Sequence, residues 1–372
     1  MAPRVVSPGS SINKTADELG PAPKEMQPMG PRLIDYGGGP DAPKGRIDLA
    51  LRQYSTPIYK YDEVSQQWVY WFPTAWALGR GSNGNVAPGA QVPDNLNWKG
   101  GEGNDGMMMV ERDSTGEMWG FWMVHQPAYN CIDFFNFPGP TWQNIGAGLL
   151  WKNPTHCGAA AGRYTNVYEP VSDKDDFERG NGMKQRALMT TIDDLLSGEI
   201  KHAIQLTITN SWFSEGPANL GKAGTDYLYP ARRCEFDRAR SVPTRDGHPF
   251  TTDKNKLTLH GTRIRFKLTA AERKEWLDRN IGRTKTPFRE FCRIVLNAIC
   301  DYGFVTTDSG GWGMLSQFDG IIGPAGPVYA KEFGIETGTT KAKLDKFNKQ
   351  CAVFAGFAME YRDRVEVVAP AP

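Results

Sequence analysis

The sequence predicts a mainly β protein: an antiparallel β-sandwich of jelly-roll type with one or two helices packed on it. Two observations favour this class. Short segments rich in β-branched, aromatic or alternating apolar residues recur along the chain, for example 106–124, 202–209 and 260–268. The 41 Gly and 26 Pro among 372 residues indicate many turns, which a fold built from short strands needs.

The clearest predicted element is a β-hairpin. Residues 106–112 and 117–124 are two apolar runs joined by a four-residue turn that contains Gly, and this arrangement is a strong hairpin signal. Side chains alternate along a strand, so Trp119 and Phe121 face one side and Trp122 faces the other. At least one of these two sets must therefore lie in the core.

Helix signals accompany the predicted strands. Thr191 can cap a short helix that Gly198 ends, and the strand 202–209 follows it. Thr269 and Glu272 have the spacing of a capping box, which predicts a second helix.

The longest predicted helix begins at Thr286, an N-cap that is followed directly by Pro287. Gly303 is expected to end it. Its apolar residues recur at helical spacing and form one stripe: Phe288, Phe291, Val295, Ala298 and Ile299. Such a stripe is expected to pack on a sheet.

We expect three parts along the chain. Residues 1–46 contain eight Pro and few large apolar groups, so this segment should be an extended N-terminal arm that a neighbouring subunit orders. Residues 47–335 should form the β-sandwich domain. Residues 336–372 should form a C-terminal extension.

Charge and composition exclude several classes of function. With 43 basic and 42 acidic residues the net charge is +1, which disfavours nucleic-acid binding because no basic field attracts a polyanion. No apolar run reaches the roughly 18 residues of a membrane span, and no apolar h-region of a secretory signal peptide is present. The six Cys and five His do not have metal-ligand spacing. We therefore expect no metal, no cofactor, no membrane insertion and no signal peptide.

Standard catalytic motifs are missing as well. The chain has no G-x-S-x-G elbow, no H-E-x-x-H, no Walker A loop and no Gly-rich dinucleotide fingerprint after a strand. We therefore assign no catalytic residue and favour binding over catalysis. The alternative is a polysaccharide hydrolase or lyase that uses a carboxylate pair with His202. Glu102 with Asp105, or Glu117 with Asp133, could supply the two carboxylates, which such chemistry needs about 5–9 Å apart.

Five residues are candidate ligand contacts: Trp312, Asp308, Arg232, His202 and Trp122. Indole rings stack on the C–H faces of sugars, while nearby acids and amides bind the hydroxyl groups. Trp312 lies in a Gly-rich loop, four residues after Asp308, and is the best single candidate for an exposed aromatic contact.

Arg232 and His202 each have two interpretations. Arg232 follows a strand break at Pro230 and can bind a carboxylate, sugar acid or phosphate in a bidentate manner. Alternatively it forms an internal ion pair with Asp308. His202 starts an apolar strand and is either a site residue near Arg232 and Asp308 or a core histidine bonded to a backbone carbonyl.

A combination of motifs gives a family resemblance over roughly residues 55–320. The motifs, in chain order, are Asp105-Gly-Met, Thr115-Gly-Glu-Met-Trp-Gly-Phe-Trp122, Ser197-Gly-Glu-Ile-Lys-His-Ala203, Tyr229-Pro-Ala-Arg232, Gly261-Thr-Arg-Ile-Arg265 and Tyr302-Gly to Asp308. In this respect the chain resembles a group of secreted bacterial β-sandwich proteins, many of which occur beside carbohydrate-active modules.

The chain also departs from that group. It has Arg233 where a His usually follows the Arg, it carries the long charged insertion 234–256, and it lacks the signal peptide. The chain therefore combines a β-sandwich like that of secreted proteins with a Pro-rich arm and no signal peptide. In this combination it is similar to structural proteins of virus particles, above all tail proteins of bacteriophages of actinobacteria.

The resemblance implies a non-enzymatic virion component, a minor tail protein, assembled in the host cytoplasm. We expect it to contact other tail subunits through its N- and C-terminal segments, as a homo-oligomer or as part of a larger assembly. Its loops are expected to attach to cell-envelope polysaccharide of the host. A second alternative, besides the hydrolase or lyase, is a purely structural tail module without a ligand.

Overall fold

The structure is a computed structural model. It describes residues 10–38, 43–60, 72–73, 107–112, 117–122, 158–159, 161–166, 183, 185–208, 211–212, 227–231, 244–245, 248–249, 258–309 and 313–370. The chain divides into two compact units. Unit 1 comprises Met1–Pro3, Leu51–Tyr168 and Asp319–Pro327, and unit 2 comprises Arg4–Ala50, Glu169–Phe318 and Val328–Pro372.

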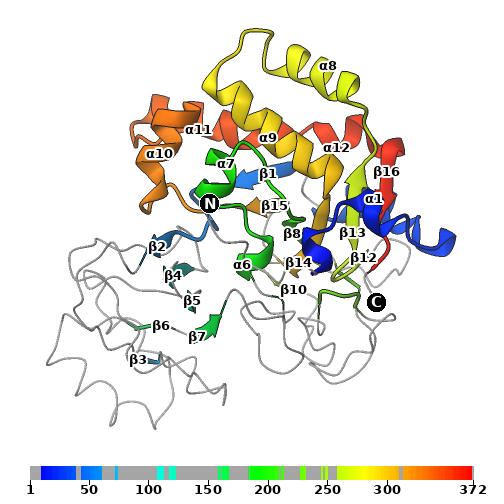
Figure 1. Cartoon of the computed structure of the whole chain (residues 1–372), viewed down its shortest axis with the longest axis horizontal. Coiled ribbons are helices and arrows are strands. Elements are labelled where there is room, and N and C mark those ends of the chain that lie inside the picture. Colours follow the sequence, from blue (N-terminus) through cyan, green and yellow to red (C-terminus); the bar gives the residue numbers. More distant parts are fainter. Residues whose placement is uncertain are drawn as a thin grey trace, which may run out of the picture. The chain divides into compact units, whose positions relative to one another are not determined.

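The fold class is mixed, so the prediction of a mainly β antiparallel sandwich is wrong. The described residues are 43% helical and 22% strand, and they include one six-stranded sheet with both parallel and antiparallel neighbours (Figure 1). The strand segments themselves were recognisable, but an apolar pattern does not encode strand direction. Two pairs of neighbouring strands that are far apart in the chain run parallel, which requires a long connection between the two strands.

Unit 2 contains the six-stranded sheet, whose order is β1-β15-β8-β14-β13-β16. The β1/β15 and β8/β14 pairs are parallel, and the other neighbours are antiparallel. The bounds are β1 (Ile47–Ala50), β15 (Met314–Gln317), β8 (Ile204–Ile208), β14 (Phe304–Ser309), β13 (Arg263–Phe266) and β16 (Val365–Val367).

One face of this sheet is apolar and is covered by helices. Phe266 lies on it, and its ring is 4.8 Å from that of Phe357 in α12 (Phe357–Glu360). The Phe357 ring is 5.3 Å from Trp276 in α8 (Ala270–Asn280). The predicted capping box opens α8.

The longest predicted helix is α9 (Pro287–Asp301). Phe291, Val295, Ala298 and Ile299 of its predicted stripe are buried. Phe291 meets the ring of Phe318 at 6.0 Å. Further helices in the described residues are α6 (Gln185–Leu188), α7 (Ile192–Leu196), α10 (Ala325–Phe333) and α11 (Lys341–Cys351), with 3-10 turns η5 (Ala352–Phe354) and η6 (Arg362–Arg364).

Residues 10–38, which we expected to belong to an extended arm, are part of unit 2 and contain four short helical segments. These are η1 (Ser11–Asn13), α1 (Ala16–Leu19), η2 (Lys24–Met26) and α2 (Met29–Tyr36). Their apolar side chains are buried: Ile12, Ala16, Leu33 and Ile34.

The N-terminal segment is bonded to the outer edge of β16. The amide of Gln27 donates to the Val367 carbonyl at 2.9 Å and accepts from the Val367 N–H at 3.0 Å. Ala22 also donates its N–H to Val367 O at 2.8 Å, and Ala369 donates to Gly20 O at 2.9 Å. The N- and C-terminal segments of this chain therefore join each other at one edge of the sheet.

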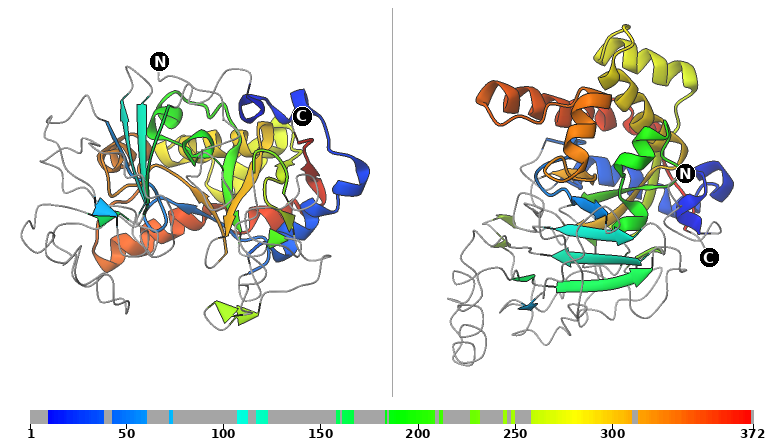
Figure 2. Two further views of the ribbon diagram at one scale, coloured as in Figure 1. Left: turned by 90° about the horizontal axis from the view of Figure 1, so that it is seen from below. Right: turned by 60° about the vertical axis from the view of Figure 1, so that its left-hand side comes forward.

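Unit 1 contains a four-stranded sheet of order β2-β4-β5-β7 (Figure 2). Its strands are β2 (Ile58–Lys60), β4 (Met108–Arg112), β5 (Glu117–Trp122) and β7 (Ala161–Asn166). β4 and β5 pair antiparallel, from Met108 opposite Phe121 to Arg112 opposite Glu117. This pairing confirms the predicted hairpin.

Three two-stranded pairs complete the described strands. They are β3 (Phe72–Pro73) with β6 (Gly158–Ala159), β10 (Thr244–Arg245) with β11 (His248–Pro249), and β12 (Thr258–Leu259) with β9 (Ser211–Trp212). Among the described residues, no helix combines the length and the apolar character required to cross a membrane.

Candidate functional site

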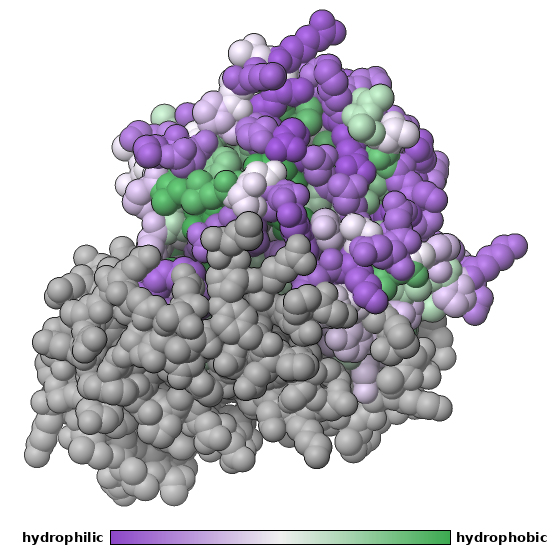
Figure 3. Space-filling model, viewed as in Figure 1, coloured by the Kyte–Doolittle hydropathy of each residue, from purple (hydrophilic) through white to green (hydrophobic). Residues whose placement is uncertain are grey.

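The helix-covered side of unit 2 presents mainly hydrophilic residues with small apolar patches (Figure 3). Many of its charges are paired within the chain. Arg273 contacts Asp301 at 2.6 Å, and Asp278 contacts both Lys274 and Arg289 at 2.6 Å. Arg273, Asp278 and Arg289 are partly buried, and their charges are already paired within the chain. The candidate site lies on the opposite face of the sheet.

The opposite face carries buried polar side chains at the centre of the sheet. Gln205 of β8 donates from Nε2 to Oε1 of Gln317 on β15 at 2.7 Å. Thr207 donates its hydroxyl to the Leu315 carbonyl at 3.1 Å. Gln205 Oε1 and Thr307 Oγ1 are buried and have no hydrogen-bond partner among the described residues. These oxygens retain unused hydrogen-bonding capacity, which is uncommon inside proteins.

A β-bulge places Asp308 on this part of the sheet. In the β14/β8 register Thr306 lies opposite Leu206, and the next pair is Ser309 opposite Ile208. Two residues of β14, Thr307 and Asp308, therefore oppose a single residue of β8. Bulges redirect side chains and occur often beside active sites. The bulge lies at the carboxyl ends of two neighbouring parallel strands, where ligands bind in many open sheets.

The structure does not bring His202 and Asp308 together. His202 precedes the start of β8, where Ile204 pairs with Phe304, and Asp308 lies near the other end of the parallel β14. At about 3.3 Å per residue, the two positions are roughly 15–20 Å apart along the strands.

His202 is bonded within the protein through both ring nitrogens. Its Nδ1 contacts the carbonyl of Ala203 at 2.8 Å, and its Nε2 lies 3.4 Å from Oδ2 of Asp194. A carbonyl oxygen only accepts, so Nδ1 is the donor in the first bond. Neither nitrogen is directed to a substrate, and the geometry is that of a core histidine.

Asp194 is held by the cap of α7 as well as by His202. Its Oδ2 accepts from the Thr191 N–H at 2.9 Å and from the Thr191 hydroxyl at 2.7 Å. Burial raises the pKa of Asp194, but the bonds and charges of His202, Arg186 and Thr191 outweigh it and lower the pKa to about 2. The Asp194–His202 pair thus joins the start of α7 to the start of β8.

The structure does not place the remaining predicted site residues relative to this pair. Trp122 belongs to β5 of unit 1, whereas His202 and Asp308 belong to unit 2. Arg232 and Trp312 lie outside the described residues. So do Glu102, Asp105 and Asp133, three of the four acids considered for catalysis, and Glu117 lies on β5.

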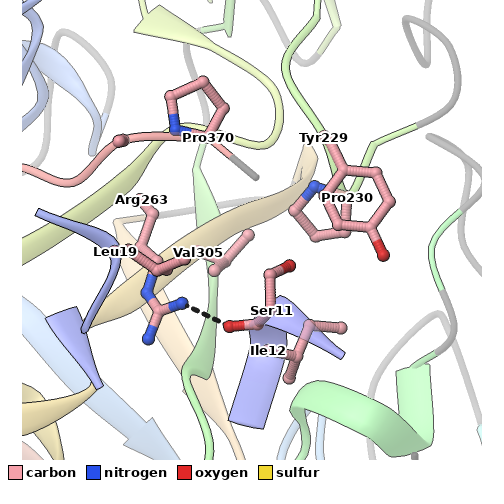
Figure 4. A pocket seen from close by; sticks show the side chains of 9 residues that line it. Ser11, Ile12, Leu19, Tyr229, Pro230, Arg263, Val305 and Pro370 are labelled. Atoms are coloured by element: carbon pink, nitrogen blue, oxygen red, sulfur yellow. Dashed lines mark hydrogen bonds between the residues drawn. The ribbon is translucent and has the colours of Figure 1, made fainter. Parts of the chain in front are cut away.

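A pocket that the sequence reasoning missed lies beside Arg263 of β13 (Figure 4). Arg263 forms one wall, Tyr229 and Pro230 form the facing wall, Val305 lies between them, and Pro370 lies across the pocket from Ser11. The pocket is a small opening: about 240 Å³ of empty space lies in and in front of it, and this figure includes open solvent. We call this the Arg263 pocket.

Arg263 is almost fully buried, with 6% of its surface exposed. Its Nε donates to Tyr302 O at 2.7 Å, Nη1 to Ser11 O at 2.8 Å and Nη2 to Lys14 O at 2.7 Å. Burial lowers the pKa of Arg263 to about 10, so the side chain stays positively charged at neutral pH.

The Arg263 pocket and the bulge lie close together on one sheet. Arg263 is directly opposite Val305, which is directly opposite Gln205, and residues that lie opposite each other share a face. Asp308 follows Val305 by three residues, about 10 Å along the strand. The alternation of Arg263 and Arg265 in the Gly261–Arg265 motif was the one sequence signal that could have indicated a cationic row on this face.

Among the described residues, no group of three or more His, Cys, Asp or Glu side chains could hold a metal ion. Comparisons of the chain with protein-family models, with curated proteins and with solved structures found no match. The resemblance to secreted bacterial proteins and to phage tail proteins stays a prediction.

Proposed function

We propose that this protein is a non-catalytic component of a virus particle that binds a cell-envelope polysaccharide through the face of the sheet that holds the Arg263 pocket. The observation that carries the proposal is the pocket itself. It combines an aromatic ring, a proline and a buried cation, and the bulge with Asp308 lies about 10 Å away along the strand.

These groups match the chemistry of a sugar. The ring of Tyr229 offers a flat apolar surface for the C–H face of a pyranose. The guanidinium of Arg263 donates hydrogen bonds, and a carboxylate such as that of Asp308 accepts them from hydroxyl groups. Trp312 follows Asp308 by four residues in the sequence, and we propose it as a second aromatic contact; it lies outside the described residues.

The geometry supports binding better than the hydrolase or lyase alternative. That alternative uses His202 with a carboxylate pair, yet both nitrogens of His202 are engaged within the chain. Its neighbouring carboxylate, Asp194, is held by the N-cap of α7. Neither ring nitrogen of His202 is therefore directed at a substrate in this structure, which supports binding over catalysis.

The location in a virion and the contacts with other tail subunits come from the sequence resemblance. The terminal segments remain the proposed route of assembly, as a homo-oligomer or within a larger assembly. The purely structural tail module, which binds no ligand, predicts the same assembly, so ligand binding distinguishes the two.

Co-sedimentation with purified cell-wall polysaccharide, combined with an assay for new reducing ends, tests the proposal. We expect the protein to sediment with the polysaccharide and to release no reducing ends. Trp312→Ala should weaken sedimentation without unfolding the protein. Release of reducing ends would contradict the non-catalytic claim. Absence of sedimentation would contradict glycan binding and favour the purely structural module.

A further inference from the structure

We infer that His202 and Asp194 form a proton-sensitive joint that holds the N-terminal turn η1 against the start of β8. In this joint the His202 ring carries a proton on both nitrogens, and the loss of one proton weakens the joint. Three features carry it: the acceptors on both sides of the ring, the fixed charge of Asp194 and the bond between Ala203 and Ile12. The joint operates whether or not the protein binds a glycan.

The His202 ring lies between two oxygen atoms that accept hydrogen bonds. Its Nδ1 is 2.8 Å from the Ala203 carbonyl oxygen, and its Nε2 is 3.4 Å from Oδ2 of Asp194. A carbonyl and an ionised carboxylate only accept, and a neutral imidazole has a single N–H. A neutral ring that donates to Ala203 therefore turns the lone pair of Nε2 toward the carboxylate. Only the doubly protonated ring donates to both oxygens.

Asp194 is the ionised acceptor that this arrangement needs. Its pKa is about 2, so its carboxylate is charged at neutral pH and carries no proton to donate to Nε2. The N–H and the hydroxyl of Thr191 donate to the same Oδ2 at 2.9 and 2.7 Å. These bonds fix the carboxylate beside the ring, so the negative charge does not move away when His202 loses a proton.

The charged groups around the pair act in opposite directions. Arg186 of α6 also acts on Asp194, and its positive charge opposes a second proton on His202. Lys201, the neighbour of His202 in the chain, is paired with Glu199. The segments η1 and β14 contribute apolar side chains to the adjacent buried cluster. The carboxylate of Asp194 is therefore the group that favours the second proton.

Ala203 connects the pair to the N-terminal segment. Its carbonyl accepts from His202, and its N–H donates to the carbonyl of Ile12 in η1 at 2.9 Å. Ile12 and Ala203 also belong to one buried apolar cluster. The start of β8, the cap of α7 and η1 thus meet at two consecutive residues, so a change of charge on His202 acts on all three.

Urea unfolding between about pH 5 and about pH 8, the range in which histidine changes charge, tests the joint. Because the folded protein favours the doubly protonated ring, the stabilisation is present at low pH and is lost as the pH rises. Over this range we expect the unfolding equilibrium constant of the unaltered protein to rise about threefold more than that of His202→Gln, the effect of one partly exposed ion pair.

Asp194→Asn is the sharper variant because it keeps His202. The amide of the new side chain donates to Nε2, so a neutral ring satisfies both contacts and the extra rise should disappear. His248→Gln, on β11, is the matched control and should behave like the unaltered protein. An equal rise in the unaltered protein, His202→Gln and Asp194→Asn would overturn the joint.

Two further measurements do not depend on the stability of a variant. Nuclear magnetic resonance of ¹⁵N-labelled histidine rings reports the protons on each nitrogen. At the pH at which an exposed histidine is half protonated, the His202 ring should be mostly doubly protonated, and a mostly neutral ring would overturn the joint. Hydrogen exchange at Ala203, corrected for the intrinsic rate, should become faster as the pH rises. Constant protection would contradict the link to η1.

Discussion

Asp194 is a carboxylate whose charge stabilises the folded chain. Its pKa is about 2 in the folded protein, against the ordinary 3.8. A carboxyl group whose pKa is lowered by folding stabilises the protein above its ordinary pKa, and this contribution is lost as the pH falls from 3.8 through 2. The difference corresponds to about 2 kcal/mol. The hydrogen bonds and charges of His202, Thr191 and Arg186 together lower the pKa of Asp194.

We therefore expect Asp194→Asn to lower the free energy of unfolding by about 2 kcal/mol at pH 7. The difference between the two proteins should shrink as the pH is lowered from 4 to 2. Urea unfolding at several pH values measures it. A difference that stays constant over that range would show that the charge of Asp194 does not stabilise the fold.

The sequence indicated part of this arrangement. A backbone carbonyl as partner of His202 was one of two interpretations, and Thr191 was the expected cap of the helix that became α7. The contact between Asp194 and His202 was not predictable, because they are eight residues apart and the turn between them sets the distance. For Arg263, no local pattern shows that its three acceptors come from residues 11, 14 and 302.

Helices and strands with strong local signals were predictable, and their pairing was not. The capping boxes, the Thr286-Pro287 start of α9 and the hairpin of β4 and β5 depend on residues a few positions apart, so the chain itself encodes them. The direction of β8 relative to β14 depends on the path of the chain between them. That path includes α8 and α9, and it produced a mixed sheet where we expected an antiparallel sandwich.

The packing of the N-terminal segment on the sheet edge was likewise not predictable from local sequence. Gln27 provides a test of this packing. Gln27 satisfies both backbone groups of Val367 at the sheet edge. In Gln27→Ala the Val367 carbonyl keeps its bond from the Ala22 N–H, but the Val367 N–H loses its acceptor, so we expect a loss of about 1–3 kcal/mol in the free energy of unfolding. Glu25→Ala, at an exposed position two residues earlier, is the matched control. Equal stability of the two variants in urea unfolding would contradict the role of Gln27.

Within unit 2, the candidate site is assembled from segments distant in the sequence. The Arg263 pocket combines side chains from residues 11, 229, 263, 305 and 370, and the bulge adds residue 308. Composition, charge and short motifs contain no information on which strands become neighbours. Sequence reasoning therefore named Asp308 and missed Arg263, although both residues belong to motifs that carried the resemblance.

The central claim is that this face of the sheet binds a glycan. The most direct measurement is the affinity of Tyr229→Ala for cell-wall oligosaccharide, compared with Tyr36→Ala, a tyrosine at the end of α2 in the same unit. Loss of one aromatic contact worth about 1 kcal/mol should weaken binding about fivefold in Tyr229→Ala, and Tyr36→Ala should bind like the unaltered protein. Equal affinity in all three proteins would contradict the claim.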